Sequence, residues 1–418
     1  MFSNLEKLVS QLMIVLLFFL FGGGIILFTG QVESSSVAKI MWATIYLITI
    51  ALVFSSSRVV LLSVQRNSGF FTLAVLSLIS TFWSSDRATT LSYSFALMGA
   101  TLAAYLLATK VEPMRLLRLV TIAVLIIISI NFIFMLPALN GNLSAENRYA
   151  GIFPQPNVLG RIAGLGVLLL VCLYCSGGMS RWAYVGIAMG LSLILASNSM
   201  TTVVAVVISL SIFFIRKSIV RPIASGHALI VLWFTLCVSG LAWLSYDAVV
   251  GFVFEIIGRS TNLTGRTGLW DGISSAIYQK PLLGYGYSGF WEGEPILSDR
   301  VIKSAGWTTK SAHNGILDVA LHLGGCGVVI FIATVLRTVV NSMKLAFGRT
   351  LPLASILFSI MCYLLILGAT ESTYMMRNSI YWVLLVICAV YTEELKRVAN
   401  CVIEKNVNTY RLRKNTNI

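Results

Sequence analysis

The chain has 418 residues, of which 57% are hydrophobic and only 11% are charged. Soluble globular domains carry about 25% charged residues, so this composition excludes that class and indicates a polytopic membrane protein. The net charge of +14 at pH 7 does not indicate nucleic-acid binding, because the excess lies in short loops and a tail that would contact anionic lipid headgroups.

Continuous apolar runs predict transmembrane helices, since a helix satisfies its own backbone groups in lipid and crosses with about 20 apolar residues. We therefore predict an all-α, polytopic membrane fold with about 12 spans. The expected spans are 8–28, 37–54, 68–83, 91–109, 115–138, 158–176, 182–197, 200–215, 228–250, 314–340, 351–369 and 378–392. The first run lacks a clear cleavage pattern, so we expect a retained helix and not a signal peptide.

The charges divide unequally between the two faces that these spans define. One face, with both termini, holds 19 of the 30 basic residues and 5 of the 16 acidic residues, and the other face nets zero. The positive-inside rule predicts that the basic face is cytoplasmic. We expect one transmembrane domain over 1–418, a long periplasmic loop over 251–313 between spans nine and ten, and a basic cytoplasmic tail over 393–418.

An outward-facing stretch from Asn147 to Asn157 contains two prolines, which favour an extended path, and Asn157 is expected to cap the next helix. Arg148 is placed at headgroup depth, and Arg161 lies about a turn inside the helix. A cation at that depth is costly and often marks a functional site. The alternative is that both arginines extend to phosphates of ordinary lipids.

Two features of the long loop stand out. The apolar residues between Thr267 and Lys280 share one helical face, which predicts a short amphipathic helix on the membrane surface with Arg266 at its N-terminal end. The segment 284–291 alternates glycines with aromatics and matches Gly-x-Gly-x-x-Gly, but no strand precedes it, which disfavours dinucleotide binding. We expect its rings at the bilayer edge or stacked on sugars.

The loop also carries carboxylates and ends at a histidine. Glu292, Glu294 and Asp299 could act as acid and base or hold a metal, although a solvated rim is the simpler expectation. His313 could accept a proton from an attacking hydroxyl, with Asn314 and Asp318 orienting the ring or the substrate. The alternative is that His313 is only a polar cap at the membrane interface.

Taken in order, these residues resemble the O-antigen ligase and polymerase superfamily, which includes exopolysaccharide-production polymerases. The similarity runs from about residue 80 to about residue 375. It rests on Asn147-Arg148-x-x-Gly151, Pro156-Asn157, Gly265-Arg266-Thr267 with Trp270, the turn from Pro281 to Trp291, His313-Asn314-Gly315 with Asp318, and Thr370-Glu371-Ser372. The chain departs from the superfamily at Ser199-Met200-Thr201, where relatives often have a basic residue between Ser and Thr.

The resemblance implies a glycosyltransferase of the type C-like membrane fold that needs no metal or cofactor. Such proteins take glycan from undecaprenyl diphosphate at the periplasmic face of the bacterial inner membrane. By position, Arg148, Arg161 and Arg266 would bind the diphosphate and His313 would be the catalytic base. The expected substrate-binding residues are Asn157, Trp270, Asn314, Asp318 and Glu371.

The acceptor decides between two activities. A polymerase transfers the glycan to another lipid-linked chain, and a ligase transfers it to a lipopolysaccharide core sugar. We favour the polymerase, because the glycine-aromatic turn and the Arg266 segment look closest to exopolysaccharide members. A transporter or flippase of lipid-linked sugars stays open as an alternative, although its polar groups would be expected near mid-span.

Overall fold

The computed structural model describes residues 2–30, 35–136, 142–143, 148–220, 266–348 and 352–415. Within these ranges helices dominate, and the only strands are the antiparallel pair β1 (Asn142–Leu143) and β2 (Tyr149–Gly151). The predicted all-α class is confirmed. The helices are α1 (Phe2–Phe19), η1 (Leu20–Gly24), α2 (Ile26–Thr29), α3 (Ser36–Ser55), α4 (Ser57–Arg66), α5 (Ser68–Ile79), η2 (Ser80–Phe82), α6 (Arg87–Lys110), α7 (Pro113–Ile133), α8 (Pro156–Cys175), α9 (Ala183–Ser197), α10 (Met200–Val220), α13 (Arg266–Gln279), α14 (Gly289–Gly293), α15 (Pro295–Ala305), α16 (Gly315–Gly348), α17 (Pro352–Thr370) and α18 (Ile380–Asn415).

Seven helical segments in the described ranges are long and apolar enough to cross a membrane, and the bent pair α4–α5 brings this to eight if it counts as one span. The chain is therefore a multi-pass membrane protein. The seven are Glu6–Gly24, Ser36–Ser55, Arg87–Lys110, Pro113–Ile133, Pro156–Cys175, Gly315–Gly348 and Pro352–Thr370. The predicted ninth span, 228–250, lies outside the described residues, so the total of 12 stays a prediction.

A break lies inside the predicted first span, and a sharp bend marks the start of the predicted third span. The predicted first span, 8–28, is broken at Gly23, which has a φ of 95° within the short π-helix η1. A Cβ at Gly23 would lie 2.6 Å from the Phe153 ring, so glycine is needed there for space as well as conformation. The predicted third span, 68–83, begins at a 98° bend between α4 and α5.

A break in α16 joins the bundle to the long loop. Gly324 adopts φ 62° and ψ −161°, and this exposes backbone groups that pair with the residues after α13. Gly325 N–H donates to the Pro281 carbonyl at 2.7 Å, and Tyr285 N–H donates to the Leu321 carbonyl at 2.8 Å. The kink therefore fixes the loop's position over the end of α16.

Replacing Gly324 by alanine is expected to destabilise the protein. The backbone conformation is one that only glycine adopts readily, and the added Cβ would lie 2.3 Å from the Leu282 carbonyl group. We expect the free energy of unfolding to fall by at least about 1–3 kcal/mol, measured as a lower melting temperature in detergent. Gly348→Ala is the control, since nothing lies within 4 Å of that position. Equal melting of Gly324→Ala and the wild type would contradict this account.

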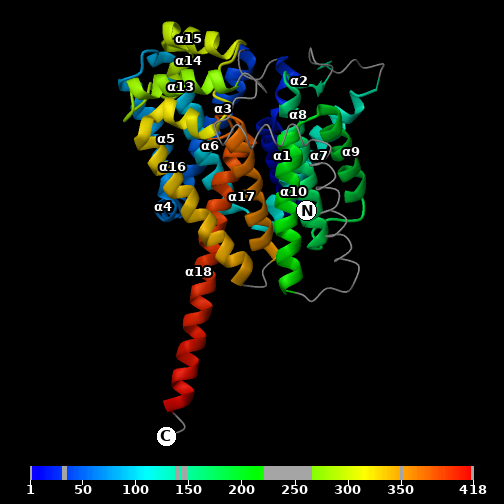
Figure 1. Ribbon diagram of the computed structural model, residues 1–418. Helices are drawn as coiled ribbons and strands as arrows, with labels where there is room; N and C mark the ends of the chain where they lie inside the picture. The colour runs from blue at the N-terminus through cyan, green and yellow to red at the C-terminus, as the bar shows by residue number, and fades with distance from the viewer. Residues whose placement is uncertain are drawn as a thin grey trace.

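The two ends of the bundle differ in what covers them. Helices α13, α14 and α15 lie together over one end, and α18 extends away from the other (Figure 1). At the α18 end, Arg66 pairs with Glu394 at 2.8 Å and Arg337 pairs with Glu393 at 3.4 Å. The connection between the second and third predicted spans and the end of the tenth therefore both contact the start of the predicted basic tail. The tail predicted over 393–418 begins as a direct continuation of α18.

Candidate active site

Glu371 lies at the centre of a cluster of polar side chains beneath α13. It directly follows the last residue of α17 and is 3% exposed. Its carboxylate accepts a hydrogen bond from Asn157 Nδ2 at 3.0 Å. Three cationic or titratable groups surround it: Arg161 Nη1 at 3.6 Å, Arg266 Nη2 at 3.7 Å and His313 Nδ1 at 3.5 Å.

Four separate elements supply this cluster. Asn157 and Arg161 are four residues apart in α8, so both face the same side of that helix. Arg266 is the first residue of α13, as the sequence predicts. His313 lies just before α16 in a left-handed conformation, with φ 47°. The structure thus brings together predicted site residues from separate outward segments.

Arg161 is a buried cation with few hydrogen-bond partners among the described residues. The residue is 7% exposed, and its Nε has no hydrogen-bond partner among the described residues. Its nearest anionic partner is Glu371, at a distance longer than a strong charge-assisted hydrogen bond. A buried charge is costly unless it is paired and hydrogen-bonded, so this guanidinium is suited to receive an additional anion.

Arg148 is linked to the cluster through Asn157. Its guanidinium donates to the Asn157 side chain at 2.6 Å and to the Ser197 carbonyl at 2.9 Å and 3.0 Å. It also donates to the Asn198 carbonyl at 3.1 Å. These bonds hold Asn157 toward Glu371 and fix the connection between α9 and α10. They also differ from the expected helix cap, because Gln155 precedes α8 and Asn157 bonds to side chains instead.

Arg266 is the more accessible of the two arginines that touch Glu371. Its side chain is 22% exposed, compared with 8% for Arg161. Arg266 Nη1 donates to the Thr370 carbonyl at 3.2 Å, which ties α13 to the end of α17. Gly265, which precedes it in the predicted motif, lies outside the described residues.

Hydrogen bonds to the neighbouring backbone hold the segment that carries His313. Trp270 Nε1 donates to the Ala312 carbonyl at 2.9 Å, and Ala312 N–H donates to Asp318 at 3.0 Å. The Asn314 side chain accepts from the N–H groups of Ile316 and Leu317 and so caps α16. Trp270, Asn314 and Asp318 are thus positioned to orient His313; their predicted contact with substrate stays a prediction.

The carboxyl of Glu371 has a pKa of about 2, well below its ordinary value. Burial raises this pKa, but contact with His313 and the charges of Arg161 and Arg266 outweigh that cost. Glu371 therefore stays ionised at neutral pH. With three arginines in or beside the cluster and one carboxylate at its centre, the site retains positive charge.

Two sequence predictions about the loop are wrong. The apolar face of α13 does not lie against lipid, because Leu269 and Ile273 are fully buried in a small core that includes Val301 and Ala305 of α15. The rings of Tyr285, Tyr287 and Phe290 are also buried, each at most 1% exposed, so they neither form a bilayer belt nor present faces to sugars. The described part of the loop is thus a packed cap. The remainder, 251–265, lies outside the described residues.

The three loop carboxylates lie outside the Glu371 cluster. Glu294 accepts from Lys280 Nζ at 2.9 Å and from Ser85 Oγ at 2.6 Å. Burial raises the pKa of Glu294, but these hydrogen bonds and the Lys280 charge bring it below its usual value. Glu292 pairs with Lys310 at 2.7 Å, and Asp299 is exposed. The sequence predicts solvated carboxylates at the rim of the loop, but Glu294 is instead held by hydrogen bonds to Lys280 and Ser85.

The sequence predicts the charged and hydrogen-bonding residues of the cluster but not their arrangement or the tyrosine beside them. Glu371 is predicted only as one substrate-binding residue, whereas the structure places it between three predicted site residues. In the sequence, the feature that could have pointed to the central role of Glu371 is its position as an acidic residue at the outer end of an apolar span. Tyr381 was missed; the Arg161 guanidinium carbon lies 5.7 Å from the centre of its ring. Nothing in its sequence context distinguishes it from other tyrosines.

Known proteins are similar to parts of this chain. A family model described as O-Antigen ligase matches residues 164–332, which include Arg266 and His313. The resemblance to O-antigen ligases and polymerases is confirmed. The exopolysaccharide production protein ExoQ of Rhizobium meliloti (strain 1021) is 24% identical over 291 residues, or 66% of this chain. The match covers 65% of the length of ExoQ.

Proposed function

We propose that this protein transfers glycan from undecaprenyl diphosphate to a sugar hydroxyl at the periplasmic face of the bacterial inner membrane. The observation that carries the proposal is the convergence of Arg161, Arg266 and His313 on Glu371 beneath the cap of α13 to α15. A positively charged and largely buried cluster suits a diphosphate. An imidazole beside it suits proton removal from an acceptor.

The proposed reaction is a single displacement at the anomeric carbon. The acceptor oxygen forms the new glycosidic bond while the bond to the diphosphate oxygen breaks. The other ring nitrogen of His313, Nε2, takes the hydroxyl proton, and Glu371 near Nδ1 stabilises the imidazolium that forms. Arg161 and Arg266 stabilise the negative charge that grows on the departing diphosphate, with no metal required. The anomeric configuration would be inverted, which nuclear magnetic resonance of the product linkage can test.

We infer that the acceptor is another lipid-linked glycan, so that the enzyme polymerises repeat units of O-antigen or exopolysaccharide. Similarity to an exopolysaccharide production protein supports this choice. The second candidate is O-antigen ligase, with lipopolysaccharide core as acceptor, and the description of the matching family model favours it. In both cases the partners are a lipid-linked donor, a glycan acceptor and the bilayer. We expect both termini on the cytoplasmic side.

Complementation of a deletion strain tests the activity and separates these candidates. His313→Ala is expected to lower glycan production by about 10²- to 10⁴-fold because it removes the base, and Arg266→Ala by about 10²-fold or more because it removes charge from the leaving group. Glycans are resolved on gels from strains with equal protein levels. Loss of long chains with single units still on the core indicates a polymerase, and loss of all core decoration indicates a ligase.

Arg300→Ala is the matched control for Arg266→Ala, because Arg300 is an exposed arginine of the same loop. It should produce glycan like the wild type. If His313→Ala and Arg266→Ala both retained full activity, the proposed site would be wrong. Cytosolic labelling of residues in 266–313 would contradict the periplasmic placement.

A further inference from the structure

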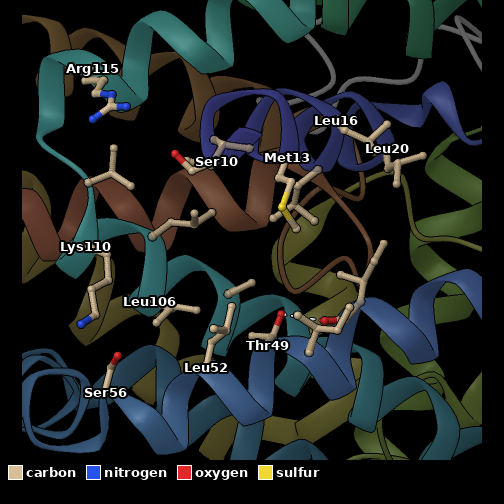
Figure 2. Close-up of a pocket in the computed structure, with 17 residues that line it drawn as sticks. Ser10, Met13, Leu16, Leu20, Thr49, Leu52, Ser56, Leu106, Lys110 and Arg115 are labelled. Carbon is tan, nitrogen blue, oxygen red and sulfur yellow. Dashed lines mark hydrogen bonds between the residues drawn. The ribbon is translucent and has the colours of Figure 1, made fainter. Parts of the chain in front are cut away.

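A cavity separate from the Glu371 cluster lies between membrane-spanning helices of the bundle. Its volume is about 520 Å³, and residues of α1, α3, α6 and the start of α7 line it. None of the residues in the Glu371 cluster contributes to it. Figure 2 shows the cavity with apolar side chains from α1, α3 and α6 around most of its wall.

The cavity lies between α1, α3 and α6. At one end, the ring centroids of Phe21, in η1 directly after α1, and of Trp42 in α3 lie 5.0 Å apart, so these rings pack together. Beyond that contact, Leu16 and Leu17 of α1 and Leu52 of α3 face a gap beside Leu106 of α6. The wall includes side chains at the lipid-facing surface, since Leu16 is 52% and Leu52 is 49% exposed.

The dimensions of the cavity fit the acyl chain of a lipid in one leaflet. Its lining residues run from Ser10 to Leu20 along α1 and the start of η1, from Ile45 to Ser56 along α3 and just past its end, and from Ala103 to Lys110 along α6. At about 1.5 Å of rise per residue, these stretches are roughly 10–17 Å long. That is close to half of a hydrocarbon core about 30 Å thick.

Two cations define the polar end of the cavity. Lys110 and Arg115 lie at one end of it, and Leu16 and Leu20 lie at the other (Figure 2). Neither cation has an ion pair with a carboxylate of the described residues. The nearby Glu112 uses both carboxylate oxygens to accept the backbone N–H groups of Met114 and Arg115 at the start of α7. An apolar cavity with two cations at one end is complementary to an anionic lipid, which has an apolar chain and a negatively charged headgroup.

We propose that this cavity binds an anionic phospholipid, with its headgroup phosphate at Lys110 and Arg115 and one acyl chain between α1, α3 and α6. The lipid would fill the gap that the helices leave and so hold α1 and α3 against α6. This site is independent of the glycan-transfer site, and its test does not depend on that activity.

Native mass spectrometry of the full-length protein tests the proposal after exchange into mixed micelles of phosphatidylglycerol and phosphatidylethanolamine. The wild type should retain phosphatidylglycerol preferentially. The double variant Lys110→Gln/Arg115→Gln should lose that preference by roughly fivefold for each cation removed. The control is Arg58→Gln/Arg118→Gln, which removes two exposed cations that do not line the cavity and should keep the preference.

A second variant tests the acyl-chain position without changing charge. Thr49 lines the cavity and is 5% exposed, so Thr49→Phe should fill the space and lower the retention of either phospholipid. The proposal is overturned if the wild type shows no headgroup preference or prefers phosphatidylethanolamine or a polyprenyl phosphate. It is equally overturned if the control double variant loses the preference as much as Lys110→Gln/Arg115→Gln, or if Thr49→Phe retains lipid like the wild type.

Discussion

Glu371→Gln is expected to lower glycan transfer by about 10²- to 10⁴-fold, the usual contribution of general acid–base catalysis, because the amide removes the acidic partner of the proposed base His313. The amide keeps the shape of the side chain but removes the charge that lies 3.5 Å from His313 Nδ1. The imidazolium formed during proton transfer would then lose its counter-charge. Arg161 and Arg266 would also lose the carboxylate that positions them.

The measurement is the initial rate of transfer by purified protein with a lipid-linked donor. Glu292→Gln is the matched control, because it makes the same substitution at a residue paired with Lys310 on the surface of the loop. Its rate should equal that of the wild type. A Glu371→Gln variant with more than about a tenth of the wild-type rate would mean that this carboxylate does not assist His313.

The same substitution has a pH-dependent effect on stability. The pKa of Glu371 is about 2, below its ordinary value of 4.5, so its ionised form stabilises the folded state above pH 4.5. That contribution should disappear as pH falls from 4.5 toward 2. Thermal unfolding of the wild type should therefore lose stability across this window, relative to Glu371→Gln, which has no carboxyl to titrate. Parallel pH curves for the two proteins would contradict the pKa argument.

Arg161→Ala is expected to lower kcat by about 10²- to 10³-fold, with a smaller effect on KM. Its guanidinium is 7% exposed and has an Nε without a hydrogen-bond partner among the described residues, so it can strengthen its bonds as charge grows on the diphosphate. Arg161→Lys should restore part of the rate, because lysine keeps the charge but not the planar set of donors. Steady-state kinetics with the lipid-linked donor separate the two constants.

Arg181→Ala provides the control, since Arg181 is exposed between α8 and α9. It should leave kcat and KM unchanged. An Arg161→Ala variant with unchanged kcat and a raised KM would indicate that Arg161 binds substrate and transition state equally, which would remove it from the proposed catalytic step.

The sequence predicts the role of some residues better than that of others. Arg161 is predicted to be functional because a cation inside an apolar helix is costly, and the structure places it beside Glu371. Tyr285 and Leu269 show the opposite case. Their aromatic and apolar character predicts burial against something, but lipid, sugar and protein all satisfy that requirement, and only the structure shows that protein covers them.

The amino-acid order by itself determined the all-α class, most of the apolar helices and the residue types available for chemistry, because hydropathy and charge are local properties. Tertiary structure decided which of these residues meet. Asn157 and Glu371 are 214 positions apart and share a hydrogen bond, and His313 reaches the same carboxylate from the start of another helix. Such contacts depend on how the helices and the loop pack, as at the break in α16 at Gly324, and no local pattern encodes that geometry.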